Sequence, residues 1–291
     1  MEVETRSGAL RRLIDEHVTP PIRRVIALQL PDRAASLAYY GFLSVPAVLL
    51  LTLGIIGLVY EPDDITRLVD RGRGVVPDEA LTLIENSLGR VADGSASGVT
   101  LVLVAIPLAL WSASGAMGAL IRALNAVHGV TETRNFVAQR MVAAGMMLWL
   151  LLAVVLVTGL MILGPVLSRW IGDAVGARGL VQLVWWTAQW PLLIGGVMLA
   201  FTGILGLGPN TPVTRPRRSV VRGAVVATVL WLIVSGAFSV YLNRFGAYGD
   251  AWGPLSVVVV MLTWMWLSSI MLLIGAYVDA ARGPAPPSSG G

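Results

Sequence analysis

Six stretches of this sequence contain no Asp, Glu, Lys or Arg over at least 21 residues each. Crossing about 30 Å of hydrocarbon takes about 20 apolar residues in an α-helix, and a helix satisfies its own backbone hydrogen-bonding groups in lipid. The stretches therefore predict an all-α, polytopic membrane protein with six transmembrane helices. The predicted spans cover about residues 34–60, 97–121, 141–167, 180–207, 223–243 and 252–278.

The composition agrees with a membrane environment. Hydrophobic residues make up 56% of the chain and charged residues 13%, whereas about a quarter of the residues in an ordinary soluble domain are charged. The chain has no cysteine, which excludes disulfides, thiolate metal sites, iron–sulfur clusters and cysteine nucleophiles. The sequence predicts no metal site and no cofactor.

The segments around the spans predict three further features. Residues 1–33 contain a basic amphipathic stretch, which predicts a helix on the cytoplasmic membrane surface. Residues 34–282 form the transmembrane domain. In its first exterior loop, residues 77–92 begin with Pro-Asp-Glu and place apolar residues at helical spacing, which predicts an amphipathic helix that either packs on the spans or acts as a gating lid. Residues 283–291 are rich in Pro, Ser and Gly, which predicts a disordered cytoplasmic tail.

Arginine placement predicts the orientation, because basic residues near the ends of spans are retained in the cytoplasm. With both termini inside, 14 of the 21 arginines fall in cytoplasmic segments and 7 in exterior segments, which also hold 10 carboxylates. We therefore expect a multi-pass protein of a bacterial inner membrane with both termini in the cytoplasm.

The six stretches contain no ionisable acid or base, which disfavours proton relays and carboxylate cation sites at membrane depth. A pathway here would be lined by hydroxyls, amides, aromatic rings and backbone, which favours an amphiphilic ligand. Prolines within the spans free backbone carbonyls and can open a cavity, although proline is also common in ordinary membrane helices. The candidate cavity residues are Tyr39, Tyr40, Ser44, Pro46, Pro107, Ser112, Ser114 and Asn125.

Polar residues follow the second span directly. Arg122, Asn125 and His128 share one helical face at three-residue spacing, and they either serve packing and topology or contact a ligand. Basic residues at the cytoplasmic edges predict contacts with anionic lipid headgroups. Nucleic-acid binding is disfavoured because no aromatic-bearing soluble domain accompanies them. The candidate lipid contacts are Arg122, Arg134, Arg215, Arg217, Arg218 and Arg222.

Three groups of residues resemble the YihY/BrkB family of bacterial inner-membrane proteins. The first is the run from Ala34 to Pro46, which reads AASLAYYGFLSVP. The second is Gly118 to Asn125 with Gly129-Val130 and the Arg-Asn-Phe that starts at Arg134. The third includes Gly223, Ala224, Trp231, Tyr241, Trp264, Trp266, Gly275 and Ala276.

The resemblance implies a six-helix inner-membrane protein associated with transport or envelope functions, in a family that has also carried a ribonuclease BN label. Trp252 to Ser256 and Gly275 to Ala280 depart from the family pattern, and Tyr277 stands where the family has a carboxylate. A mechanism that uses that acid is therefore in doubt here. Metal-assisted RNA hydrolysis needs several convergent His, Asp or Glu ligands, so we expect no enzyme.

The leading hypothesis is a transporter, exporter or flippase-like protein for an amphiphilic or lipid-linked envelope component. The alternative is a membrane scaffold that docks partners without transport, and an intramembrane enzyme ranks third. We expect membrane lipids and an amphiphilic substrate as partners, and no nucleic acid.

Overall fold

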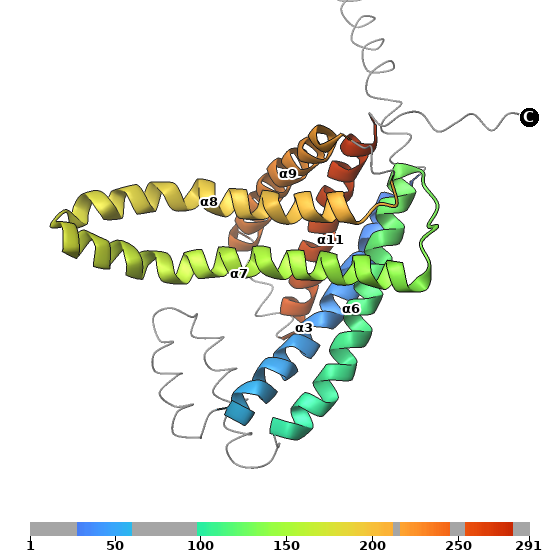
Figure 1. The fold of residues 1–291 in the computed structure, drawn as a ribbon, viewed down its shortest axis with the longest axis horizontal. Helices are drawn as coiled ribbons and strands as arrows, with labels where there is room; N and C mark the ends of the chain where they lie inside the picture. Colours follow the sequence, from blue (N-terminus) through green and yellow to red (C-terminus); the bar gives the residue numbers. More distant parts are fainter. Residues whose placement is uncertain (1–27, 60–97, 212–215, 245–253, 282–291) are drawn as a thin grey trace, which may run out of the picture. The chain divides into compact units, whose positions relative to one another are not determined.

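The computed structural model describes residues 28–59, 98–211, 216–244 and 254–281 (Figure 1). Four predictions fall outside these residues: nearly all of the N-terminal amphipathic segment, the exterior helix at 77–92, the tail at 283–291, and the lipid contact of Arg215.

The described residues form six long helices, which confirms the predicted all-α fold. Five of them are long and apolar enough to cross a membrane. The remaining helix contains most of the predicted span at 34–60, and that span stays a prediction. The helices are α3 (Leu30–Val59), α6 (Gly98–His128), α7 (Phe136–Val175), α8 (Arg178–Leu207), α9 (Arg217–Arg244) and α11 (Pro254–Ala280).

Most helices extend beyond the predicted spans. For example, α6 continues past Arg122 to His128, and α9 begins at Arg217 rather than at residue 223. The predicted spans end at charged residues, but a helical backbone continues through them because arginine can direct its head group to water while its stem stays on apolar surface. The helices also continue through Pro46, Pro107, Pro165 and Pro191.

The chain divides into two compact units, which we describe separately. Residues 39–116 form the smaller unit. In it the Tyr40 ring lies against Gly115, where an added Cβ would come within 2.7 Å of the ring. Ala47, Ala105 and Ser112 are buried in the same unit. A glycine at 115 therefore lets α3 and α6 approach closely.

The larger unit contains two helix pairs. In the first pair, α7 and α8 run antiparallel after a turn at 176–177 and form a long hairpin (Figure 1). Trp149 lies against Gly203, and its Nε1 donates to the carbonyl of Leu199 at 2.8 Å. Trp185 lies against Gly164 in the same way. The hairpin therefore packs by placing large rings onto glycines.

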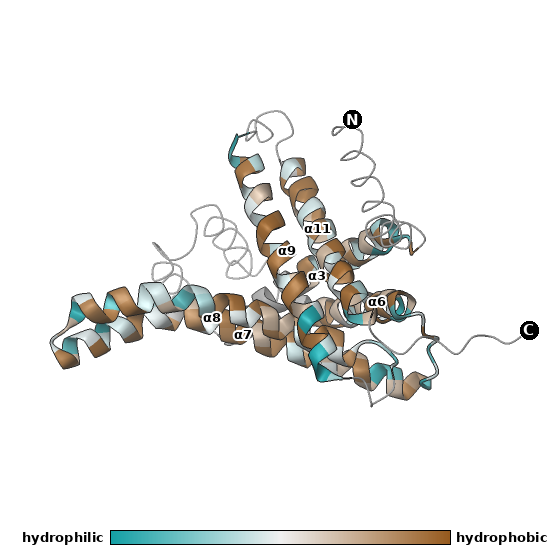
Figure 2. Cartoon of the chain, turned by 90° about the horizontal axis from the view of Figure 1, so that it is seen from above, coloured by the Kyte–Doolittle hydropathy of each residue, from teal (hydrophilic) through white to brown (hydrophobic). Residues whose placement is uncertain are grey.

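The core of the larger unit lies where the last turns of α6, α8 and α11 converge with α7, α9 and the first turns of α3. Its largest fully buried apolar side chains are Leu30, Ile121, Leu124, Met146, Leu205 and Leu273. Elsewhere many large apolar side chains are exposed, and Figure 2 shows hydrophobic residues along most of each described helix. Such helices are typical of membrane spans, where lipid covers the apolar surface.

Candidate functional site

The second helix pair, α9 and α11, packs through small residues. A Cβ added to Gly223 would lie 2.6 Å from the carbonyl oxygen of Gly275, and a Cβ added to Gly275 would lie 2.6 Å from that of Gly223. Ala227 follows Gly223 one turn later and also contacts Gly275. This small-residue spacing allows two membrane helices to approach with their backbones nearly in contact.

Tryptophan–serine hydrogen bonds continue the same contact line away from the glycines. Trp231 Nε1 donates to Ser268 Oγ at 2.9 Å, and Trp264 Nε1 donates to Ser235 Oγ at 3.3 Å. The two indole rings meet edge to face with their centroids 6.0 Å apart. Each indole N–H thus gains an acceptor from the opposite helix, which membrane interiors favour.

At the Arg217 end of the pair, a buried polar cluster joins α9 and α11 to α6. The side chain of Asp279 is fully buried, with 0% exposure, and the side chain of His128 is 4% exposed. His128 Nε2 lies 3.3 Å from Asp279 Oδ2. Ser219 Oγ lies 2.7 Å from both Oδ1 and the carbonyl oxygen of Asp279. We call these three residues the His128–Asp279–Ser219 cluster.

The hydrogen-bond pattern places one proton of the histidine. Nδ1 lies 2.8 Å from the carbonyl oxygen of Leu124, which can only accept, so Nδ1 carries a hydrogen. A hydrogen bond between Nε2 and Asp279 Oδ2, 3.3 Å apart, requires one more proton on one of the two atoms. It sits either on Nε2, giving an imidazolium and a carboxylate, or on Oδ2, giving two neutral groups. The His128–Asp279 pair has zero net charge in both cases.

The order of the three groups differs from that of a nucleophilic triad. In a triad the histidine contacts the serine and acts as its base, while the carboxylate orients the histidine. Here Asp279 lies between His128 and Ser219. The cluster therefore ties three helices together rather than placing a base on a nucleophile. Among the described residues, no three His, Asp or Glu side chains are grouped to hold a metal ion.

A second polar network lies beside this cluster and joins the loop after α6 to the turn after α8. Asn125 donates to Glu132 Oε2 at 2.8 Å and accepts from the backbone N–H of Asn210 at 2.7 Å. Arg134 donates to the carbonyls of Gly208 and Pro209 at 3.2 and 2.7 Å. The network accounts for the burial of Asn125 at 4% exposure.

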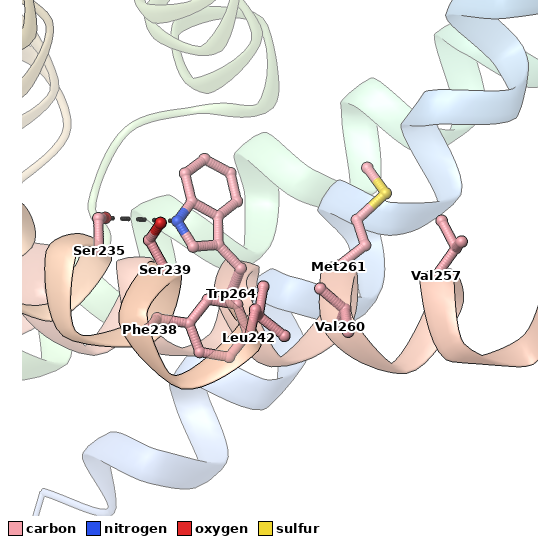
Figure 3. A pocket seen from close by; sticks show the side chains of 8 residues that line it. All are labelled: Ser235, Phe238, Ser239, Leu242, Val257, Val260, Met261 and Trp264. Atoms are coloured by element: carbon pink, nitrogen blue, oxygen red, sulfur yellow. Dashed lines mark hydrogen bonds between the residues drawn. The ribbon is translucent and has the colours of Figure 1, made fainter. Parts of the chain in front are cut away.

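Two grooves lie on the α9–α11 pair, one toward each end. We call them the Ser235 groove, of about 370 Å³, and the Arg222 groove, of about 360 Å³. Figure 3 shows the Ser235 groove, with Trp264 reaching across to Ser235 and with Met261 and Val257 along α11. The Ser235 groove is lined by Ser235, Phe238, Ser239, Leu242, Val257, Val260, Met261 and Trp264, and the Arg222 groove by Ser219, Arg222, Val225, Val226, Tyr277, Val278 and Ala281.

The predicted cavity residues, Asn125 apart, lie in the smaller unit, and they line neither of the two grooves. Tyr39 is exposed and meets Tyr40 edge to face at 5.5 Å. Ser44 and Ser112 donate to carbonyls of their own helices, Ser114 is half-buried, and Pro46 and Pro107 are exposed. Asn125 lies in the larger unit. A cavity at the first seven positions stays a prediction.

The predicted lipid contacts have different surroundings. Arg122, Arg217 and Arg218 are exposed, and Arg222 lines a groove. Arg134 is engaged with backbone carbonyls of the α8 turn. Contact with lipid stays a prediction for all of them.

Sequence reasoning missed Asp279 and Ser219. Both lie just outside the predicted spans, Asp279 one residue beyond residue 278 and Ser219 before residue 223. One signal was available: Ser219, Gly223 and Ala227 repeat at four-residue spacing, and Gly275 and Asp279 repeat at the same spacing. Two such small or polar stripes indicate a close helix pair whose polar ends meet.

Known proteins resemble this chain over most of its length. Residues 22–286 match the model of a family described as virulence factor BrkB. YfkH of Bacillus subtilis (strain 168), whose name describes it as ribonuclease-like, is 29% identical over 250 residues, which are 86% of this chain and 88% of YfkH. A UPF0761 membrane protein of Vibrio atlanticus is 26% identical over 86% of this chain and 77% of its own length.

A further UPF0761 membrane protein, from Chromohalobacter salexigens, is 28% identical over 211 residues, which are 72% of this chain and 48% of that protein. No solved structure matches the chain.

Proposed function

The chain belongs to the BrkB virulence factor family, as its motifs predicted, and from that premise we propose that this multi-pass membrane protein moves an amphiphilic or lipid-linked envelope component across the bilayer. It does so as a transporter, exporter or flippase, and not as an enzyme.

The two grooves on one helix pair carry this proposal. Arg222 and Ser239 line different grooves and are separated by 17 residues of α9, or about 26 Å along a helix axis. That distance is close to the roughly 30 Å of a hydrocarbon core. An amphiphile that crosses the membrane needs a place for its head group near both surfaces, and α9–α11 offers one toward each end.

The lining of the Ser235 groove suits such a passenger. Ser235 and Ser239 provide hydroxyls, while Phe238, Val260 and Met261 provide apolar wall. No lining residue of this groove is charged. Ligand sites of this kind combine mainly apolar walls with a few polar groups that fix orientation.

The test is transport by the purified full-length protein in vesicles, with a panel of fluorescent phospholipids and lipid-linked sugars. Ser239→Trp fills the Ser235 groove, and Leu148→Trp on α7, where Leu148 is 66% exposed, is the matched control. We expect Ser239→Trp to slow movement about tenfold, equal to roughly 1.4 kcal/mol in the barrier, and the control to leave it unchanged.

No protein-dependent movement of any panel member would refute transport. In that case stable crosslinked partners in native membranes would favour the scaffold alternative instead.

A further inference from the structure

The Arg222 groove is amphipathic along its length. Ser219 and Arg222 lie in the first two turns of α9, and Ala281 lies just after the end of α11. Val225, Val226 and Val278 lie about one turn deeper along the pair. The charged rim therefore falls at the boundary of the predicted span that begins at residue 223, and the apolar wall falls inside it.

The positive charge of this rim is exposed, whereas the acid bonded to Ser219, Asp279, is buried and also bonds to His128. Arg222 is exposed, and its Nε donates to the carbonyl of Arg218 at 3.2 Å, a bond that uses one of the five N–H donors of the guanidinium. The first turn of α9 contains no acidic residue. A guanidinium offers paired donors that match two phosphate oxygens, and the positive end of the long α9 helix dipole favours an anion at the same place.

The apolar half of the groove distinguishes a lipid from a free phosphate ion. A phosphate held by Arg222 covers only the rim, whereas an acyl chain attached to it covers Val225, Val226 and Val278. Removing that apolar surface from water and headgroup contact is favourable in proportion to its area. Tyr277, beside Val278 on α11, adds to the lining an aromatic ring of the kind that prefers the headgroup level.

The buried cluster holds the two walls of the groove in place. Ser219 lines the groove and bonds to Asp279, and Val278, the neighbour of Asp279, lines the opposite wall. His128 anchors Asp279 from α6. Ser219 and Asp279 are thus positioning residues, which fix the distance between Arg222 and the apolar wall.

We propose that the Arg222 groove binds one anionic phospholipid, with its phosphate on Arg222 and an acyl chain along Val225, Val226 and Val278. The site goes beyond the proposed transport, because a lipid can be held here whether or not any passenger is moved.

The experiment titrates the purified full-length protein with phosphatidylglycerol and, separately, with phosphatidylcholine of the same acyl chains, and counts bound lipids by native mass spectrometry. Arg222→Gln removes the proposed phosphate contact. Arg244→Gln, at the other end of the same helix and also exposed, is the control. Val225→Trp fills the apolar half at a position that is 41% exposed.

We expect phosphatidylglycerol to bind about tenfold more tightly than phosphatidylcholine, and Arg222→Gln to remove that preference while Arg244→Gln keeps it. Val225→Trp should weaken both lipids. Equal losses in the two arginine variants would show general electrostatic attraction and overturn the site. Competition by soluble glycerol phosphate at the same concentration would show a phosphate site without a chain, and would also overturn it. Binding and movement are measured in separate assays, so failure of transport leaves this result intact, and failure of lipid binding at the Arg222 groove leaves the vesicle assay free to detect movement.

Discussion

The α7–α8 hairpin and the α9–α11 pair both pack through glycine, but they use it differently. In the hairpin, Gly203 and Gly164 receive the rings of Trp149 and Trp185. In α9–α11, Gly223 and Gly275 bring the two backbones together. A ring that packs on a glycine can move to relieve a close contact. Two backbones already in contact have no side chain between them that could move. The comparison indicates that α9–α11 is the more constrained pair, and grooves of fixed shape lie on it.

The two helix pairs also differ in the hydrogen bonds that their polar side chains form. Trp231 and Trp264 both find serine acceptors across α9–α11. In the hairpin Trp149 has a carbonyl acceptor, but Trp185 Nε1 is buried without one in the described residues. Ser168 of the hairpin is buried and bonds only within its own helix in the contacts observed, to Pro165. Hydrogen bonds between the two helices therefore contribute more to the packing of α9–α11 than to the packing of α7–α8.

The largest expected effect is that of Asp279→Ala. Removing one member of a buried, hydrogen-bonded pair costs about 3 kcal/mol or more, because His128 and Ser219 lose their partner. Ser168→Ala in the hairpin should cost less than about 1 kcal/mol. Thermal unfolding of both variants in detergent measures the difference. Equal shifts would break the contrast between the two pairs.

Glycine substitution tests the backbone contact. Gly275→Ala places a Cβ 2.6 Å from the carbonyl oxygen of Gly223, so the helices must separate, at about 2 kcal/mol for an overpacked contact. Gly203→Ala instead meets the Trp149 ring, a side chain that can shift at the smaller cost of its hydrogen bond to Leu199. We expect the larger loss of stability for Gly275→Ala in the same unfolding assay. The reverse order would mean that the ring, and not the backbone, is the rigid element.

The smallest effect concerns the indole hydrogen bonds. Trp231→Phe removes the donor to Ser268 and Trp149→Phe removes the donor to Leu199, and each should cost about 0.6 kcal/mol, typical of hydrogen bonds between membrane helices. If the two variants lose similar stability, the difference between the two helix pairs lies in the backbone contact and the buried cluster, and not in the indole hydrogen bonds. A much larger cost for Trp231→Phe would extend the contrast to the indole hydrogen bonds.

The sequence predicted the helices well because charge is excluded from hydrocarbon, so a charge-free stretch reveals a span directly. The helix ends were harder to predict from the positions of charged residues. Helix α9 begins at Arg217, before the predicted span, and α6 ends at His128, after the predicted span. The family motif drew attention to Tyr277 as a missing acid, yet the carboxylate that matters structurally is Asp279, two residues later.

The partners of Asp279 could not be read from the sequence, because His128 lies 151 residues away and Ser219 lies 60 residues away. Spacing along one helix shows which residues share a face. It does not show which other helix that face meets, and the His128–Asp279–Ser219 cluster depends on that choice of neighbour.

The proton shared by His128 and Asp279 has an electrical consequence. Whether it rests on Nε2 or on Oδ2, the pair sums to zero charge, and moving it shifts a proton by only the length of one hydrogen bond. A membrane potential acts on a charge displaced through the field, at about 2.3 kcal/mol per elementary charge for every 100 mV crossed. A membrane potential should therefore exert little force on the His128–Asp279 pair itself, whether the cell is energised or depolarised.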